Sequence, residues 1–135
     1  MIFTALSDEP LSTQAIVERV HTPAAGAVVV FEGRTRAEEG LVRLSYEAFT
    51  ERATKQLEAF ANQIADRPGI HGVAAVHRTG DVGIGEPSVV VVVCAAHRAE
   101  AFDGARDLID RIKAEAAIWK QQILAGTAHW VGLPR

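Results

Sequence analysis

The fold is decided by the stretch Ser88-Val89-Val90-Val91-Val92-Val93-Cys94-Ala95-Ala96-His97-Arg98. Its long β-branched, apolar run is typical of a strand that is covered on both faces. The run ends abruptly at His97 and Arg98, two groups that can carry positive charge. Where a helix begins after a strand, free backbone N–H groups favour an anion, and these side chains add to that preference. The alternative is a satisfied polar pair at a strand end, and the sequence leaves both interpretations open.

A helical pattern follows directly, with apolar residues at three- and four-residue steps. They are Ala101, Ala105, Leu108, Ile109, Ile112, Ala116 and Trp119. On an unbroken helix Lys113 and Lys120, seven residues apart, share a face beside this stripe. Partial desolvation there lowers a lysine pKa and makes the amine a usable base or nucleophile. Alternatively the stems pack while the charges stay in water. We expect the element after the strand to bring both lysines back near His97 and Arg98, and the sequence therefore predicts one anion site formed by these four residues.

Length and composition set wide limits on the function. The chain has 135 residues, which suits a single domain, 1–135, with a real core. A net charge of −3 argues against general affinity for nucleic acid or anionic membranes, so anion binding requires a local cluster. No apolar run approaches the ~20 residues of a membrane span, and the N-terminus lacks a signal-peptide pattern. We expect a cytoplasmic protein.

Metal and cofactor chemistry find little support in the sequence. The single cysteine, Cys94, excludes an internal disulfide framework, and inside an apolar strand it reads as an inert packing group. The histidines His21, His71, His77 and His129 lack metal-ligand spacing. We therefore expect no metal site and no resident cofactor.

The remaining pattern predicts an α+β protein with helices packed on a mostly antiparallel sheet. Apolar alternation or runs predict strands, and amphipathic spacing with a capping residue predicts helices. The expected strands are 2–6, 27–32 (ended by Gly33), 42–49, 72–78 and 127–131, with a short one near 82–84. The expected helices besides the one after His97 are 13–20, capped by Ser12, and 51–66, capped by Thr50.

A charged loop, 34–40, follows the second predicted strand. Arg34 and Arg36 stand in it, and the arginine fork suits phosphate and carboxylate oxygens. The alternative is a solvated loop whose arginines pair with Glu38 and Glu39. Spacing alone does not decide between the two.

Taken together, four ordered segments resemble the MoaE family, the large catalytic subunits of molybdopterin synthase. The segments are Gly26 to Arg36, Leu44 to Phe49, His77-Arg78-Thr79-Gly80 with Gly85-Glu86 and Val91 to Arg98, and Ile112-Lys113 through Ile118-Trp119-Lys120. They cover most of the chain in the family's order. The resemblance implies an α/β hammerhead-like fold with additional β structure.

The resemblance also implies a sulfurtransferase of molybdenum cofactor biosynthesis. Such a subunit converts cyclic pyranopterin monophosphate into molybdopterin by installing the two dithiolene sulfurs. The sulfur arrives as a thiocarboxylate on the C-terminal Gly-Gly tail of a small ubiquitin-like, MoaD-like carrier subunit. The implied assembly is a homodimer of large subunits with a carrier at each end, a heterotetramer.

Carried over by position, the family's site residues fall on ten residues of this chain. Arg36, His97 and Arg98 would hold the phosphate and pterin, with Arg34 and Thr35 in the same loop. Lys113 matches the lysine beside the thiocarboxylate carbon, Lys120 is the second lysine, and Gln121 and Gln122 follow along the pocket wall. Arg135 falls one position away from an arginine that reaches the neighbouring subunit's site.

One departure concerns the chain between the two lysines. The family often has a proline two residues before the tryptophan of its Trp-Lys pair, and here Ala117 stands there. The lysines would therefore meet either by helical spacing or across a bend, and the sequence leaves both open.

Two other functions fit the same residues. One is a non-enzymatic α+β module that binds a phosphorylated metabolite; the other is a dimeric scaffold for a ubiquitin-like protein with a degenerate site. A sensor needs only charge, so arginine would replace Lys113 and Lys120 without loss of binding. The presence of all four groups, His97, Arg98, Lys113 and Lys120, argues against degeneracy.

Overall fold

Two antiparallel strands, 70–78 and 87–95, form the centre of the computed structural model, which describes residues 1–132. They lie inside a four-stranded sheet of order β1-β4-β6-β2, in which only β1 and β4 are parallel. The elements in chain order are β1 (Ile2–Ser7), α1 (Thr13–Val20), β2 (Ala27–Arg34), β3 (Leu41–Ala48), α2 (Thr50–Ala65), β4 (Ile70–Arg78), β5 (Gly80–Gly83), β6 (Pro87–Ala95), α3 (Arg98–Glu115), β7 (Ile118–Leu124) and β8 (Thr127–Val131).

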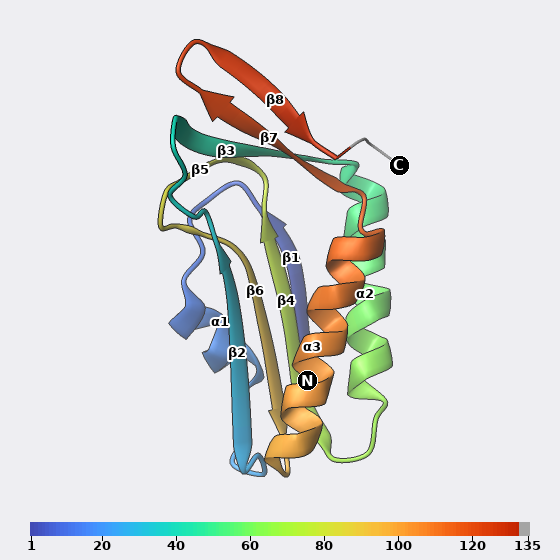
Figure 1. Cartoon of the computed structure of the whole chain (residues 1–135). Helices are drawn as coiled ribbons and strands as arrows, with labels where there is room; N and C mark the ends of the chain where they lie inside the picture. The colour runs from blue at the N-terminus through green and yellow to red at the C-terminus, as the bar shows by residue number, and fades with distance from the viewer. Residues whose placement is uncertain (133–135) are drawn as a thin grey trace.

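Helices cover both faces of this central sheet. Side chains of β6 alternate between two cores: Val91 and Val93 pack with α2 and α3, whereas Val90 and Val92 pack with α1. Figure 1 shows α2 and α3 on one side of the sheet and α1 on the other. The prediction of a strand buried on both faces is confirmed, because every residue of β6 after Pro87 is buried.

A second sheet, of order β5-β3-β7-β8, lies across one end of the first (Figure 1). Its inner face contributes a small core of Leu41, Leu44, Tyr46 and Val82. The C-terminal end of α3 leads directly into this sheet through β7. The predicted α+β class is confirmed, although the β structure forms two sheets.

The apolar spacing of α3 continues as far as Trp119, but the helix ends at Glu115, and of the two alternatives that the sequence left open the bend is the one observed. Ala116 has extended backbone, with φ −66° and ψ 139°, and β7 begins at Ile118. β7 pairs antiparallel with β3, so that Lys120 lies opposite Tyr46. The extended conformation of β7 therefore comes from pairing with a distant strand.

The bend between α3 and β7 is held by Gln56 of α2. Its Nε2 donates to the carbonyl of Glu115 (2.8 Å), and its Oε1 accepts from the backbone N–H of Ala117 (2.7 Å). The carbonyl of Ala117 accepts from the N–H of Phe49 (2.9 Å). A proline at position 117 would have no N–H to pair, whereas this chain pairs the N–H of Ala117 through Gln56.

Removing this clamp should destabilise the protein. We expect Gln56→Ala to lower the free energy of unfolding by about 1–2 kcal/mol, because two backbone groups at the bend lose their partners. Gln63→Ala, an exposed position on the same helix, serves as the control and should change it by less than about 0.5 kcal/mol. Chemical denaturation measures both, and equal effects of the two substitutions would contradict the role of Gln56.

Most other predicted elements are confirmed within a residue or two. The predicted helix 13–20 has those bounds, and the Ser12 hydroxyl accepts from the N–H of Ala15. Two details were wrong. β2 continues past Gly33 to Arg34, with a register shift, because β6 still offers a partner there. Phe49 occupies the N-cap position of α2, which therefore begins at Thr50.

Candidate functional site

A cavity of about 250 Å³ lies where the C-terminal end of α3 meets the second sheet. α3 contributes Lys113, β7 contributes Lys120, β3 contributes Tyr46 and β4 contributes His77. The rest of the lining comprises Ser88, Val89, Ile109, Ile112, Ile118, Trp119, Val131 and Gly132. The cavity thus combines two amines with a partly apolar wall.

The two lysines reach the cavity from different elements. Lys113 lies in the last turn of α3, and the chain then bends and returns along β7 to Lys120. Sequence spacing left helix and bend as alternatives, and the bend is the one observed. The physical reason is the pairing of β7 with β3, which turns Lys120 inward beside Tyr46.

The surroundings of Lys120 lower its pKa below the ordinary value of 10.5. Burial is the main cause that lowers the pKa of Lys120, and the charges of Lys113 and Arg36 lower it further. The carboxylate of Glu38 acts in the opposite direction. Burial also raises the pKa of Tyr46, whose hydroxyl has a hydrogen bond with Ser88.

The lowered pKa can be measured directly. The chain has three lysines, so protein labelled with ¹³C at the lysine Cε gives three lysine signals. The signal that is missing in Lys120→Arg is the signal of Lys120. We expect the Lys120 signal to titrate below the ordinary value of 10.5. Between that midpoint and 10.5 the unfolded chain binds more protons than the folded one, so the contribution of Lys120 to stability rises with pH. A midpoint at or above 10.5 would contradict the described environment.

His77 is a site residue that the sequence did not single out. Its ring lies edge-on to Tyr46, with centroids 4.9 Å apart, and its Nδ1 is 2.7 Å from the carbonyl oxygen of Arg78. Burial lowers the pKa of His77 to about 4, and the charges of Lys113 and Lys120 act in the same direction. A lone histidine at the end of an apolar strand carries no distinguishing signal, which is why spacing missed it.

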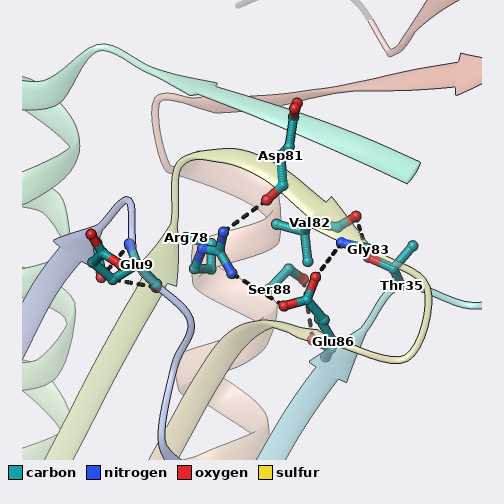
Figure 2. A network of polar contacts seen from close by, with 10 residues as sticks. Glu9, Thr35, Arg78, Asp81, Val82, Gly83, Glu86 and Ser88 are labelled. Carbon is teal, nitrogen blue, oxygen red and sulfur yellow. Dashed lines mark hydrogen bonds and ion pairs between the residues drawn. The ribbon is translucent and has the colours of Figure 1, made fainter. Parts of the chain in front are cut away.

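A buried arginine, Arg78, organises the ends of β4, β5 and β6 beside the cavity (Figure 2). Its Nη2 donates to the carbonyl of Asp81 (2.7 Å), and its Nη1 lies 3.8 Å from Oε2 of Glu86. The other oxygen of Glu86 accepts from the N–H of Gly83 (2.7 Å). These contacts fix the strand ends from which His77 and Ser88 face the cavity.

Thr35 belongs to this framework. Its side chain is buried, and its hydroxyl donates to the carbonyl of Val82 (Figure 2). Its N–H donates to the carbonyl of Glu86, and its own carbonyl accepts from the N–H of Gly85. Thr35 therefore anchors the start of the 34–40 loop to the turn before β6.

Both arginines of the loop have acidic neighbours, but only Arg36 has one of the partners that the alternative interpretation expected, Glu38. Arg34 lies 2.7 Å from Glu32, whose pKa is lowered first by the hydrogen bond from Thr13 and then by Arg34. Arg36 pairs with Glu38 at 2.9 Å but is 84% exposed. Of these two arginines, Arg36 is the one whose charge contributes to the lowered pKa of Lys120.

The two glutamines that follow Lys120 lie on β7. Gln121 is in register with Ser45 and Trp130, and Gln122 with Leu44 and His129. Neither is among the described residues that line the cavity. Because side chains alternate along a strand, Gln122 shares the inner face with Lys120 and Gln121 does not.

His97 and Arg98 lie at the other end of α3, and the prediction that one chain brings them to the lysines was wrong. Arg98 begins the helix, and fifteen residues separate it from Lys113, about 22 Å along the axis at 1.5 Å per residue. His97 is 83% exposed and has its Nδ1 3.5 Å from Glu100. The helix leads away from the strand end in a straight line, so the lysines do not pass it. Arg135 lies outside the described residues.

Residues 1–132 contain neither a candidate metal site nor a candidate membrane-spanning helix. No group of three or more His, Cys, Asp or Glu side chains there is arranged to hold a metal ion. No helix in that part of the chain combines the length and apolar character needed to cross a membrane.

Comparison with known proteins gives one consistent match. The family model described as MoaE protein matches residues 6–115. Molybdopterin synthase catalytic subunit 1 of Mycobacterium tuberculosis is 38% identical over 133 residues, covering 96% of this chain and 90% of that protein. Molybdopterin synthase catalytic subunit of Thermoplasma volcanium is 36% identical over 132 residues, covering 95% and 96%.

Solved structures agree with the sequence comparison. Molybdopterin synthase from Staphylococcus aureus has a TM-score of 0.89 and 32% identity, covering 95% of this chain and 96% of that one. A complex of subunits 1 and 2 of molybdopterin-converting factor from Helicobacter pylori contains a chain with the same fold. That chain has a TM-score of 0.82 and 23% identity, covering 95% of this chain and 89% of its own length.

Proposed function

The chain belongs to the MoaE family, and from that premise we propose that it is the catalytic subunit of a molybdopterin synthase. It is an enzyme of molybdenum cofactor biosynthesis. Its reaction moves sulfur from the C-terminal thiocarboxylate of a small ubiquitin-like carrier to cyclic pyranopterin monophosphate, and forms the dithiolene of molybdopterin.

The observation that carries this proposal is the convergence of Lys113 and Lys120 on one partly apolar cavity. Sulfur transfer from an acyl group passes through a tetrahedral adduct that bears an oxyanion, which a nearby ammonium group stabilises. Lys113 takes this role and orients the thiocarboxylate. Lys120, whose pKa is lowered, moves protons at the pterin carbons as a general acid and base.

The substrate phosphate requires fixed positive charge, which arginine supplies at any working pH. Arg36 is the loop arginine suited to this role, since its guanidinium is exposed and its charge reaches Lys120. Arg34 and Thr35 support the same loop through Glu32 and the turn before β6. Gln122 lies on the same face of β7 as Lys120, beyond the cavity lining, and is the glutamine placed to contact the substrate, whereas Gln121 faces the other side of the strand.

His97 and Arg98 complete the site from a second copy of the chain. Within one chain they are a helix length from the lysines, so a role at the substrate requires a homodimer with shared sites. Exposed apolar groups near that end of α3 support a contact there, since Phe102 is 60% exposed and Val28 and Val30 are exposed on edge strand β2. Arg135 belongs to the same proposal as a contribution to the neighbouring site.

The carrier is the second partner. The Helicobacter complex pairs two subunits of molybdopterin-converting factor, and we assign this chain an equivalent small, Gly-Gly-ended partner in a heterotetramer. The cavity offers two cations to the anionic end of such a tail. An amide tail that ends in glycine is also narrow enough to enter a cavity of about 250 Å³.

Reconstitution tests the proposal. The purified protein is mixed with a thiocarboxylated MoaD-type carrier and cyclic pyranopterin monophosphate, and the dithiolene product is assayed. Product must require all three components and must be lost when the carrier ends in an ordinary carboxylate. Binding of the pyranopterin without any turnover would instead indicate the metabolite-binding module.

A further inference from the structure

His77 has no assigned part in the reaction, yet it lines the same cavity as the two lysines. It lines the cavity together with Lys113, Lys120 and Tyr46, and it comes from β4, the central strand beside β6. The groups that face it from neighbouring elements are the two ammonium groups and the tyrosine ring. Its side chain is therefore held in a rigid part of the fold.

The hydrogen bonding of the ring fixes its tautomer. Nδ1 lies 2.7 Å from the carbonyl oxygen of Arg78, which can only accept, so Nδ1 carries the proton. Nε2 of the neutral ring is then an acceptor. Nε2 has no hydrogen-bond partner among residues 1–132. The fully buried side-chain nitrogens without a hydrogen bond in this part of the chain belong to Arg43 and Arg78, so Nε2 of His77 is not fully buried. Nε2 therefore opens onto the cavity.

The imidazole is neutral at pH 7, because its burial and the two lysine charges oppose a further proton. The lysine and tyrosine side chains that line the cavity are hydrogen-bond donors. Nε2 of His77 is a neutral acceptor that lies among these donors. A matching ligand carries an anionic end and, close to it, an N–H or O–H donor.

We propose that Nε2 of His77 accepts a hydrogen bond from the amide N–H of the carrier's terminal glycine while Lys113 and Lys120 hold that residue's anionic end. This inference rests on the proposed function. A terminal glycine carries its thiocarboxylate and its amide N–H on either side of one carbon, so both fit one small cavity. His77 thereby sets the depth and orientation at which the acyl carbon reaches Lys113.

The test removes each member of the hydrogen bond in turn. A Gly-Gly-ended carrier is compared with a semisynthetic carrier in which glycolate replaces the last glycine, an isosteric ester without the N–H. His77→Asn keeps a donor for the carbonyl of Arg78 but lacks the acceptor at Nε2, whereas His77→Gln places an amide oxygen near Nε2. Affinities are measured by calorimetry on the full chain, and thermal melting checks each variant's fold.

The expected pattern is a double-mutant cycle with coupling. The ester should bind the unmodified protein about 3- to 10-fold more weakly, the effect of one neutral hydrogen bond. His77→Asn should weaken the amide carrier equally and abolish the difference between amide and ester, and His77→Gln should restore part of it. Binding of cyclic pyranopterin monophosphate should not change in either variant.

Several results would overturn the inference. The proposed hydrogen bond would be excluded if His77→Asn still bound the amide carrier more tightly than the ester carrier, or if the unmodified protein bound both equally. The proposed function would stand in either case. Loss of pyranopterin binding with unchanged carrier binding would assign the acceptor to the other substrate. Failure of the unmodified protein to bind the amide carrier would overturn the proposed function itself. If His77→Asn does not fold, His77→Gln takes its place. A difference in affinity between amide and ester that is smaller than in the unmodified protein supports the inference, and an unchanged difference contradicts it.

Discussion

Lys113→Ala is expected to lower dithiolene formation by about 10²- to 10³-fold, the usual cost of removing one group that stabilises an oxyanion. The side chain lies in the last turn of α3 and points into the cavity that also holds Lys120. It does not belong to the buried core around Leu108 and Ile112, so the variant should fold normally. Reconstituted turnover measures the loss, and thermal melting confirms the fold.

Two control variants make this result specific. Lys55→Ala removes the remaining lysine, which is 75% exposed on α2 beside Glu51, and should leave turnover unchanged. Lys113→Arg keeps the charge but replaces a compact ammonium with a broad guanidinium, and should recover little activity. Full activity in Lys113→Ala would exclude the assigned role. If the unmodified protein shows no turnover and Lys113→Arg still binds the substrate, the metabolite-binding module is favoured.

The elements that sequence predicted well are those whose pattern is local. The apolar run of β6 and the capped amphipathic helix α1 contain their own signals, since burial on two faces and the Ser12 cap are visible in the residues themselves. β7 lacks such a signal. Ala116 and Trp119 continue the helical spacing of α3, and only pairing with β3, at least seventy residues earlier, makes the segment extended.

The site shows the same division. That Lys113 and Lys120 belong together could be predicted, although they meet across a bend that depends on Gln56 of another helix. The distance of His97 and Arg98 from the lysines also follows from the helical pattern, because any helix that runs from Arg98 to Lys113 separates these two residues by about 22 Å at 1.5 Å per residue. The prediction of one joint site did not take this length into account. His77 enters the cavity through its place on a central strand, which a single histidine in a sequence does not reveal.

The separation of the two cationic clusters leads to the second large expected effect, in mixed dimers. Arg98→Ala and Lys113→Ala should each give nearly inactive homodimers when reconstituted with the carrier. If sites are shared between copies, a dimer that contains one subunit of each kind has one site with both defects and one intact site. Purified mixed dimers should therefore recover about half of the unmodified turnover, because a two-fold dimer has two equivalent sites.

A second mixed dimer serves as the control for sites that are shared between the two subunits. Lys113 and Lys120 line the same cavity of one chain, so mixed dimers of Lys113→Ala and Lys120→Ala have a defect at each site and should stay inactive. Differently tagged subunits allow both mixed dimers to be purified and compared at equal concentration. Inactivity of the Arg98→Ala and Lys113→Ala mixture would mean that His97 and Arg98 act without crossing between copies. Because α3 separates them from the lysines by about 22 Å, at 1.5 Å per residue, they would then have no direct role at the reacting atoms.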